Sequence, residues 1–282
     1  MAAADNESPA TAPGRGPGEN GPGDAIALRP VRKVTADGVA ETQDALAVER
    51  WLRLILNGRE IAALMASPGY EDELGAGFAL TQGLVKHRGE LLSVSLRRDD
   101  DGRPAVRIVV PIELSLALAD RASAQASCGG VVHADDELPV IEGEGPVVAA
   151  EGLRGMARAM TAGQTIYRRT GGTHGAGLFT VSGELVVLRE DVGRHNAADK
   201  AVGHCLLAGI DLKDKALVVT GRVSRDIAAK AVRAGVPILA SMSAPTDAGI
   251  EVAVRGGLTV IGFLRGRRMN ICSHPCRIDF GA

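Results

Sequence analysis

The chain has 282 residues, of which 45% are apolar and 2% aromatic, and its formal net charge is −2. That length suits one large or two ordinary domains whose core is built from Ala, Val, Leu and Ile. A near-neutral chain argues against a general nucleic-acid binder, which needs a basic face. No apolar run approaches the roughly 20 residues of a membrane span, and the N-terminus has no apolar signal core. We therefore expect a cytoplasmic protein without membrane insertion.

The first part of the sequence predicts a tail followed by a small domain. Residues 1–24 are rich in Ala, Pro and Gly and lack apolar periodicity, so we expect a disordered tail. The following pattern predicts a hairpin over residues 48–65 that turns at Asn57-Gly58, a helix over 71–85, a hairpin over 91–110 that turns at residues 100–102, and a helix over 112–121. We assign an N-terminal α+β domain to residues 25–125.

The remainder of the chain predicts strands that alternate with helices. Residues 126–146 are acidic, contain Gly and Pro, and are expected to form a mobile loop between domains. After them the pattern predicts a helix over 149–160, strands over 177–181 and 184–189, a helix over 195–207, a strand over 216–220, a helix over 224–234, a strand over 236–240, a helix over 246–255 and a strand over 258–263. Such alternation implies right-handed crossovers and a parallel sheet covered on both faces. The order is similar to the cytidine deaminase fold, so we predict an α/β protein whose residues 147–282 form a deaminase-like, three-layer, cofactor-binding domain.

Small and polar residues follow the expected strand ends of this domain. Parallel sheets bind ligands beyond the carboxyl ends of their strands, where helix N-termini point outward. Gly allows close approach of the backbone to a ligand, and free N–H groups together with Arg favour phosphates. Each loop alone is explained as well by helix capping and solvated arginines, but their convergence predicts a site for a large anionic ligand. The candidate contacts are Thr173, His174, Gly193, Arg194, His195, Asn196, Arg222, Ser224, Ser243, Phe263, Leu264, Arg265, Gly266, Arg267 and Arg268.

The residues at two helix starts argue against a zinc deaminase. That chemistry needs His-x-Glu at one helix start and Pro-Cys-x-x-Cys at the next. This chain has His195-Asn196-Ala197 at the first place and Arg222-Val223-Ser224 at the second, so the Glu and both thiolates are absent. We expect neither deamination nor bound zinc. His174, predicted to lie in a loop, and His195 are candidates for ligand contacts or, equally, for packing of their loops.

There are four cysteines: Cys128, Cys205, Cys272 and Cys276. They do not form the dense framework of a secreted disulfide scaffold and indicate thiols in a reducing cytosol. The Gly129-Gly130 pair after Cys128 would give a nucleophilic or sulfur-carrying thiol the access it needs, although a small filler in a turn fits this position as well. Cys205 lies on an apolar helical face and is expected in the core. Cys272 and Cys276 lie on either side of His274. These three residues are fewer than the four ligands of a structural zinc site.

Several short runs of residues, taken in their order along the chain, form a recognisable set. They are Ser127-Cys128-Gly129, residues 169–174, residues 190–196, Asp199-Lys200, residues 220–224, residues 240–246 and residues 262–270. Together they resemble the formate dehydrogenase accessory sulfurtransferases, the FdhD/NarQ family, over nearly everything after about residue 45. The resemblance rests on the set of runs, because none of them alone is specific.

The resemblance implies a two-domain, usually dimeric protein with a deaminase-like C-terminal domain. Members take sulfur from a cysteine desulfurase as a cysteine persulfide. They pass it to the Mo-bis(molybdopterin guanine dinucleotide) cofactor, which is then inserted into formate dehydrogenase. The resemblance assigns the persulfide to Cys128 and the cofactor-binding segment to Phe263 through Arg268. The implied partners are a cysteine desulfurase, formate dehydrogenase and a second copy of the chain.

One departure from the family bears on sulfur transfer. Members often have Cys-x-x-Cys where this chain has Cys128-Gly129-Gly130-Val131. A persulfide needs a single sulfur carrier, so transfer is still expected, but a resolving thiol would have to come from Cys272 or Cys276. Val131 favours an alternative, a cofactor-binding chaperone without sulfur transfer. A third alternative, a nucleotide-modifying enzyme on a deaminase scaffold, is disfavoured by the missing zinc ligands.

Overall fold

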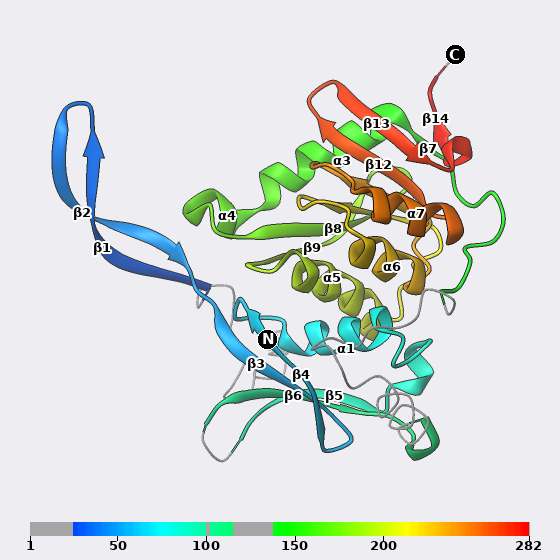
Figure 1. Ribbon diagram of the computed structural model, residues 1–282, viewed down its shortest axis with the longest axis horizontal. Helices are drawn as coiled ribbons and strands as arrows, with labels where there is room; N and C mark the ends of the chain where they lie inside the picture. The colour runs from blue at the N-terminus through cyan, green and yellow to red at the C-terminus, as the bar shows by residue number, and fades with distance from the viewer. Residues whose placement is uncertain (1–24, 100–101, 115–137, 282) are drawn as a thin grey trace, which may run out of the picture.

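The described part of the chain is a mixed α/β structure with a smaller N-terminal half and a larger C-terminal half (Figure 1). The structure is a computed structural model, and it describes residues 25–99, 102–114 and 138–281. In the N-terminal half, a sheet of four strands in the order β4-β3-β6-β5 packs against the helix α1. The bounds are β3 (Arg50–Leu56), β4 (Arg59–Ala66), α1 (Glu71–Thr81), the short 3-10 helix η2 (Arg88–Glu90), β5 (Ser93–Arg98) and β6 (Pro104–Val109).

Both hairpins predicted in this half are confirmed. β3 and β4 pair around Asn57 and Gly58, whose φ angles of 44° and 86° are those of a tight two-residue turn. β5 and β6 pair along their whole length, and the tip of their turn lies outside the described residues. The local sequence therefore determines these two pairings through turn residues and β-forming side chains.

The helices of this half are shorter than predicted or only partly described. α1 ends at Thr81 because Gly83 takes a left-handed φ of 71° and the N–H of Leu84 bonds back to the carbonyl of Ala79. Of the helix predicted over 112–121, residues 112–114 are helical, and the others lie outside the described residues.

A long two-stranded ribbon precedes this sheet and was not predicted from the sequence. β1 (Ile26–Thr35) pairs with β2 (Gly38–Ala47) over ten residues in each strand, as a sheet of its own. In Figure 1 it extends away from the rest of the molecule, and its base lies beside the short helix α4 (Thr165–Thr170). Most of its residues are exposed. Because it has no buried face, its sequence lacks the alternation by which a half-buried strand is recognised. We call this ribbon the arm.

The C-terminal half contains a sheet of six strands in the order β13-β12-β11-β10-β8-β9. The bounds are β7 (Val148–Ala149), α3 (Ala150–Gly163), β8 (His174–Thr180), β9 (Leu185–Asp191), α5 (Arg194–Ala208), β10 (Lys215–Val219), α6 (Arg225–Arg233), β11 (Ile238–Ser241), α7 (Asp247–Arg255), β12 (Thr259–Arg265), β13 (Arg268–Ser273), η4 (Pro275–Arg277) and β14 (Ile278–Asp279). The predicted alternation of strands and helices is confirmed, but the prediction of a parallel sheet is wrong in part. β10, β11 and β12 are parallel, whereas β8, β9 and β13 run antiparallel to a neighbour. The sequence pattern did not predict α4 or β13.

Alternate residues of the central strands face two separate cores. In β10, Leu217 and Val219 belong to the larger core, which includes residues of α5 and α6. Ala216 and Val218 point to the other face and belong to the smaller core, which includes residues of α3. The C-terminal half is therefore a sheet with helices on both sides, and its layers follow from the two-residue period of a strand. Within the described ranges, every helix is too short or too polar to span a membrane.

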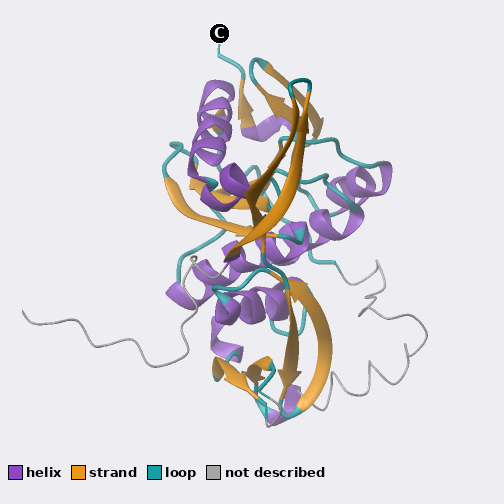
Figure 2. Cartoon of the chain, turned by 90° about the vertical axis from the view of Figure 1, so that its left-hand side faces the viewer, coloured by secondary structure: helices purple, strands orange, loops and turns teal. Residues whose placement is uncertain are grey.

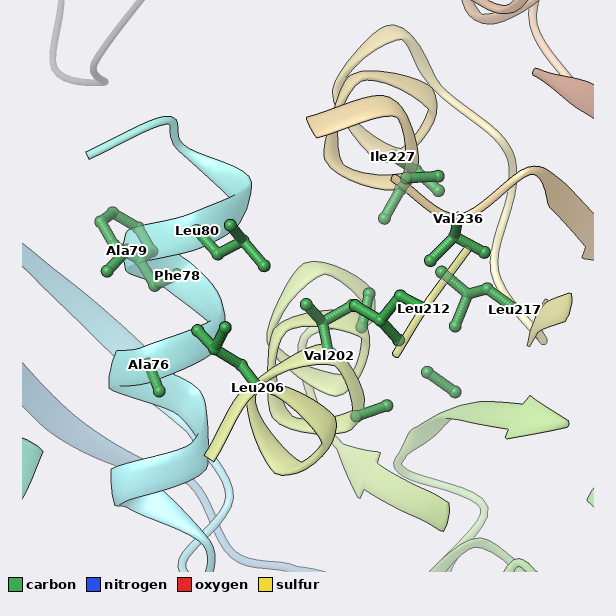
Figure 3. Packing of buried hydrophobic residues seen from close by; sticks show 14 of the residues in the cluster. Ala76, Phe78, Ala79, Leu80, Val202, Leu206, Leu212, Leu217, Ile227 and Val236 are labelled. Atoms are coloured by element: carbon green, nitrogen blue, oxygen red, sulfur yellow. The ribbon is translucent and has the colours of Figure 1, made fainter. Parts of the chain in front are cut away.

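The larger core continues through α5 into the N-terminal half. Figure 3 shows Phe78 and Leu80 of α1 on one side and Val202 and Leu206 of α5 beside them. The two helices touch directly, because a Cβ added at Gly77 would lie 1.8 Å from the carbonyl oxygen of Asp199. A Cβ added at Gly203 would likewise lie 1.8 Å from the carbonyl oxygen of Glu73. Only glycine at both positions permits this approach, and the helices seen between the strands of the two halves in Figure 2 depend on it.

A buried ion pair lies beside this helix contact. The Nζ of Lys230, on α6, lies 2.8 Å from both carboxylate oxygens of Asp199, on α5. The hydroxyl of Thr81, at the end of α1, donates to the same carboxylate at 2.7 Å and accepts from Lys230 at 2.9 Å. Removing one partner would leave a buried charge without compensation, which costs about 3–5 kcal/mol. The three helices are therefore fixed in one arrangement.

Replacing Gly77 by Ala should lower the free energy of unfolding by about 3 kcal/mol or more, because the new methyl group meets backbone atoms that cannot rotate away. The same substitution at Gly155, inside α3, is the matched control. A Cβ there meets only Arg158 Nη2 at 3.8 Å, so Gly155→Ala should raise stability by about 0.5–1 kcal/mol through helix propensity. Urea denaturation of the two variants measures both effects. Equal stability of Gly77→Ala and wild type would contradict the direct helix contact.

Candidate functional site

Five segments of the C-terminal half meet at one edge of the six-stranded sheet. β10, β11 and β12 are parallel and end at this edge, and β9 ends there as well. β8 begins there, because it is antiparallel to β10. The structure thus brings together the segments that the sequence pattern places at strand ends. We call this edge the rim and define it as residues 173–175, 191–196, 220–224, 241–246 and 263–268.

Hydrogen bonds join neighbouring segments of the rim. The N–H of Gly175 donates to Thr220 Oγ1 at 3.0 Å, and His174 Nδ1 lies 3.4 Å from the same hydroxyl. The Ser241 hydroxyl donates to the carbonyl of Gly221 at 2.6 Å. The prediction that His174 lies in a loop is wrong: it is the first residue of β8 and pairs with Asp191 of β9. Its position is therefore set by two neighbouring strands.

The first turn of α5 makes one part of the rim electropositive. Its N-cap is Gly193, which has no side chain to accept from the helix, and its first turn contains Arg194 and His195 but no acid. The free N–H groups of a helix start carry partial positive charge and favour anions. Gly221 lets the Arg194 side chain lie across it, because a Cβ there would come within 3.0 Å of Arg194 Cβ and Cδ.

Three buried polar atoms of the rim lack a hydrogen-bond partner within the described residues. They are Arg194 Nε, His195 Nε2 and Ser224 Oγ. Ser224 is the N-cap of α6 but does not cap it with its side chain, whereas the N-cap of α7, Thr246, accepts from the N–H of Gly249 at 3.2 Å. A buried polar atom without a partner costs about 1–3 kcal/mol. These three atoms are therefore suited to contact a polar ligand.

Both rim histidines have a pKa below that of an ordinary histidine. Burial lowers the pKa of His195 to about 4, and the charges of Arg194 and Lys230 act in the same direction while Asp226 opposes them. Burial and Arg194 also lower the pKa of His174, against the effect of Asp191. Permanent positive charge at the rim therefore comes from arginines, and the neutral imidazole of His195 contributes one donor and one acceptor.

The arginine-rich segment forms the turn of a hairpin. The sequence pattern predicts that the last strand ends at Phe263, but β12 continues to Arg265, which pairs with Arg268 of β13 across Gly266-Arg267. Phe263 lies in the irregular part of the ladder with a left-handed φ of 53°, and the Arg268 guanidinium carbon lies 4.9 Å from the centre of its ring. Arg265 Nε donates to the carbonyl of Met242. Residues 265–268 are all exposed, so their charges are available at the rim.

Three of the predicted ligand contacts are engaged in holding the fold. Thr173 is buried and donates to Glu190 at 3.0 Å, and Glu190 in turn accepts from the first N–H groups of α4. Asn196 is buried and donates to the carbonyl of Met65 at 2.8 Å and to Asp191 at 3.0 Å. Leu264 belongs to the smaller core. The side chains of Arg222 and Ser243, by contrast, are exposed and partly exposed.

A buried pair that was not predicted fixes the loop before α5. Lys200 Nζ lies 2.7 Å from Asp191 Oδ2, and both side chains are fully buried. Asp191 also accepts from the N–H groups of Gly193 at 2.8 Å and of Ser67 at 3.0 Å, and Lys200 donates to the carbonyl of Ser67 at 2.8 Å. Both residues lie in the runs that mark the family resemblance, but nothing in their spacing indicates a contact between a strand end and the middle of a helix.

The four cysteines have different environments. Cys128 lies outside the described residues. Cys205 is buried in the core, as predicted, and burial raises the pKa of its thiol to about 11. Cys272 is partly exposed and Cys276 is exposed. Within the described ranges, no three His, Cys, Asp or Glu side chains are grouped as metal ligands, so Cys272, His274 and Cys276 do not form such a group. The zinc content of the protein stays a prediction.

Comparisons with known proteins agree on one family. A model of the FdhD/NarQ family matches residues 47–279. The chain is 34% identical over 270 residues to the sulfur carrier protein FdhD of Nocardia farcinica, covering 91% of this chain and 96% of that one. It is 35% identical over 276 residues to the protein of the same name from Mycobacterium tuberculosis, covering 91% and 99%. Its structure is similar to that of a putative formate dehydrogenase accessory protein from Desulfotalea psychrophila, with a TM-score of 0.73, 27% identity and coverage of 90% and 99%.

Ser224→Ala and Thr246→Ala form a matched pair at two helix starts. Thr246→Ala removes a capping bond and should lower the free energy of unfolding by about 1 kcal/mol. Ser224→Ala removes a hydroxyl without a partner and should change it by less than about 0.5 kcal/mol. Urea denaturation distinguishes the two. A loss of 1 kcal/mol or more in Ser224→Ala would mean that the hydroxyl is used by the fold and is not free for a ligand.

The low pKa of His195 predicts a pH dependence of stability. Between about pH 4 and the roughly 6.5 of an ordinary histidine, the unfolded chain binds more protons at this residue than the folded chain. Stability should therefore fall as the pH drops through this range, and His195→Gln should reduce the fall. The difference between the two unfolding profiles isolates this residue from the carboxylates. An imidazole NMR titration of His195 with a midpoint near 6.5 would contradict its burial as a neutral ring.

Proposed function

Because the chain belongs to the FdhD/NarQ family, we propose that it is a sulfur carrier protein required for formate dehydrogenase activity. In this proposal it takes sulfur from a cysteine desulfurase as a persulfide on Cys128. It then passes the sulfur to the Mo-bis(molybdopterin guanine dinucleotide) cofactor before that cofactor enters formate dehydrogenase. The observation that carries the cofactor part is the rim, where arginines and unpartnered polar atoms converge at strand ends.

The loading step needs one thiolate and one persulfide. The Cys128 thiolate attacks the outer sulfur of the donor persulfide, and a new S–S bond forms at Cys128. The S–S bond of the donor breaks, and the desulfurase cysteine leaves as a thiolate, so no external oxidant or reductant is consumed. A second cysteine is not required, which makes the step compatible with Val131. Such a thiol works in a reducing compartment, and a cytoplasmic location is part of the proposal.

The arginines of the rim support binding of the phosphate groups of a molybdopterin guanine dinucleotide. Arg265, Arg267 and Arg268 are exposed at the hairpin turn, where guanidinium groups can pair with phosphate oxygens in two-pronged fashion. Arg194 and Ser224 lie at the starts of α5 and α6, where backbone N–H groups favour the same charge. The family resemblance assigns cofactor binding to Phe263 through Arg268, which is the turn described above.

The proposal also covers the type of fold that the C-terminal half adopts. We regard its sheet, with helices on both faces, as a cytidine deaminase-like scaffold from which the zinc chemistry is absent. The order of its strands and helices supports this view. Ala197 and Ser224 stand where a deaminase would need its Glu and one of its cysteines. The scaffold would then supply helix starts for an anionic ligand and no metal.

Two further elements complete the proposal. The partners are a cysteine desulfurase, formate dehydrogenase and a second copy of the chain, as in the family that the chain resembles. The alternative function is a chaperone that binds the molybdenum cofactor without transferring sulfur, and Val131 is the residue that favours it. The two functions differ in one measurable property, which is sulfur on Cys128.

Variants of the thiol and of the arginine turn should separate sulfur carriage from cofactor binding. After loading by a desulfurase, mass spectrometry should find the extra sulfur on Cys128, and Cys128→Ala should carry none while binding GDP normally. Arg267→Ala or Arg268→Ala should weaken GDP binding roughly tenfold or more and load sulfur normally, because each removes a charge-assisted phosphate contact.

Matched controls are available for both variants. Cys276→Ala removes an exposed thiol away from the rim, and Arg158→Ala removes an exposed arginine that pairs with Glu151 on α3. Neither control should change sulfur loading or GDP binding. Extra sulfur on Cys205 alone, or on no cysteine, would exclude the carrier and leave the chaperone. Normal GDP binding in both arginine variants would place the cofactor elsewhere on the rim.

A further inference from the structure

The arm is the most exposed regular element of the described structure. β1 and β2 form a separate two-stranded sheet, and its base is held by Ala47 against Gly172 and by contacts with α4. Each strand has ten residues, which corresponds to a length of about 33 Å. An isolated ribbon of two strands is only marginally stable in water. Its far end therefore needs a partner to stay ordered.

The two faces of the arm differ in how many large apolar side chains they expose. Residues opposite each other in an antiparallel ladder share a face. The face that we call the apolar face holds Leu28 opposite Ala45, Pro30 opposite Gln43, Arg32 opposite Glu41 and Val34 opposite Val39. The other face, which we call the polar face, holds Ala27 opposite Leu46, Arg29 opposite Asp44, Val31 opposite Thr42 and Lys33 opposite Ala40. Its one large exposed apolar side chain is Leu46, at 43%. On the first face Leu28, Val34 and Val39 are 58%, 73% and 67% exposed, which is unusual for side chains of this size when they lie on one strip.

The apolar face has one basic and one acidic side chain, and their positions are complementary to those on a second copy of the same face. Arg32 Nε lies 3.4 Å from Glu41 Oε1, and the two side chains are 78% and 81% exposed. When two such faces meet about a two-fold axis parallel to the strands, β1 of one copy lies over β2 of the other. Arg32 then faces the partner copy's Glu41, and Val34 faces the partner copy's Val39, each contact occurring twice.

The overall charge of the arm also permits close approach of two copies. Between residues 26 and 47 the chain has three basic residues, Arg29, Arg32 and Lys33, and three acidic residues, Asp37, Glu41 and Asp44, so the arm is formally neutral. A strongly acidic or basic partner would find no complementary field on it, whereas two neutral, self-matching faces do not repel each other.

We propose that the apolar face of the arm is the contact surface for a second copy of this chain, with Arg32 of each copy against Glu41 of the other. The inference rests on the homodimer proposed above and adds the surface that forms it. The face measures roughly 33 Å by 10 Å, which is less than the ~800 Å² per partner of a standard stable interface. The dimer is therefore weak, with a Kd on the order of micromolar.

A mixing experiment distinguishes contacts between copies from the contact within one arm. Arg32→Glu leaves two acids on the face, and Glu41→Arg leaves two bases. Each variant of the full chain should dimerise at least tenfold more weakly than wild type in sedimentation velocity between about 1 and 100 μM. An equimolar mixture, with one chain labelled by a fluorophore, should form heterodimers with near wild-type affinity, although the pair within each arm is still broken in both chains.

Two further variants serve as controls. Arg29→Glu changes a charge on the polar face of the same arm and should leave dimerisation unchanged. Val34→Gln removes an apolar side chain that is exposed in the single chain, so it should weaken the dimer without lowering the free energy of unfolding. It tests the same face even where a charge reversal disturbs the arm itself.

The outcomes separate this proposal from the ones before it. A wild-type chain that stays monomeric at 100 μM overturns both the homodimer and the role of the arm. A wild-type dimer that persists in Arg32→Glu, Glu41→Arg and Val34→Gln overturns the role of the arm alone. The role of the arm is also overturned if the mixture forms no heterodimers and Val34→Gln dimerises as wild type does. Sulfur loading of Cys128 is measured independently and does not depend on either result.

Discussion

The contact of α1 with α5 through Gly77 and Gly203 is the constraint on which the rest of the structure depends. The two helix backbones touch, so α1 belongs to the N-terminal sheet on one side and to the C-terminal helices on the other. Apolar side chains of both halves then share a single core. The buried pair of Asp199 and Lys230 is satisfied only in this arrangement, since Thr81 supplies its remaining hydrogen bond from α1. Close packing and buried charge thus favour the same docking of the two halves.

This docking extends to the rim through the start of α5. Ser67 and Met65 lie at the end of the N-terminal hairpin, yet they bond to Asp191, Lys200 and Asn196 in the C-terminal half. Arg194 and His195 follow directly after this anchored loop. The N-terminal half therefore acts on the candidate site by holding the loop that presents it. Mutations of residues 65–67 are therefore expected to shift the loop that presents Arg194 and His195.

The sequence predicts those features of the structure that local sequence patterns determine. Short stretches of sequence determine three features that the structure contains. They are the Asn57-Gly58 turn, the alternation of strands with helices, and the polar segments that meet at one sheet edge. The contact between Gly77 and Gly203, or between Asp191 and Lys200, joins residues whose partners are chosen only when the chain is folded. The arm was missed because it has no buried face. β13 was missed because the arginine-rich residues that lead into it were interpreted as a ligand-binding loop, although Met269 and Ile271 alternate with Arg268 and Asn270. Leu264 is predicted as a ligand contact because it stands between Phe263 and Arg265, and the sequence does not show that its side chain is buried in the smaller core.

The rim combines two kinds of electrostatic environment, and this bears on how it can hold one large anion. The arginines of the hairpin turn are exposed, so salt at moderate concentration screens their attraction for phosphate at distances beyond about 10 Å. Arg194 and the starts of α5 and α6 are partly buried, where screening is weaker and a missing hydrogen bond costs more. His195 stays neutral there, which avoids the cost of a second buried charge beside Arg194. The exposed turn is thus suited to attract an anion from solution, and the buried group to fix its orientation, because orientation depends on hydrogen bonds that only a desolvated ligand can complete.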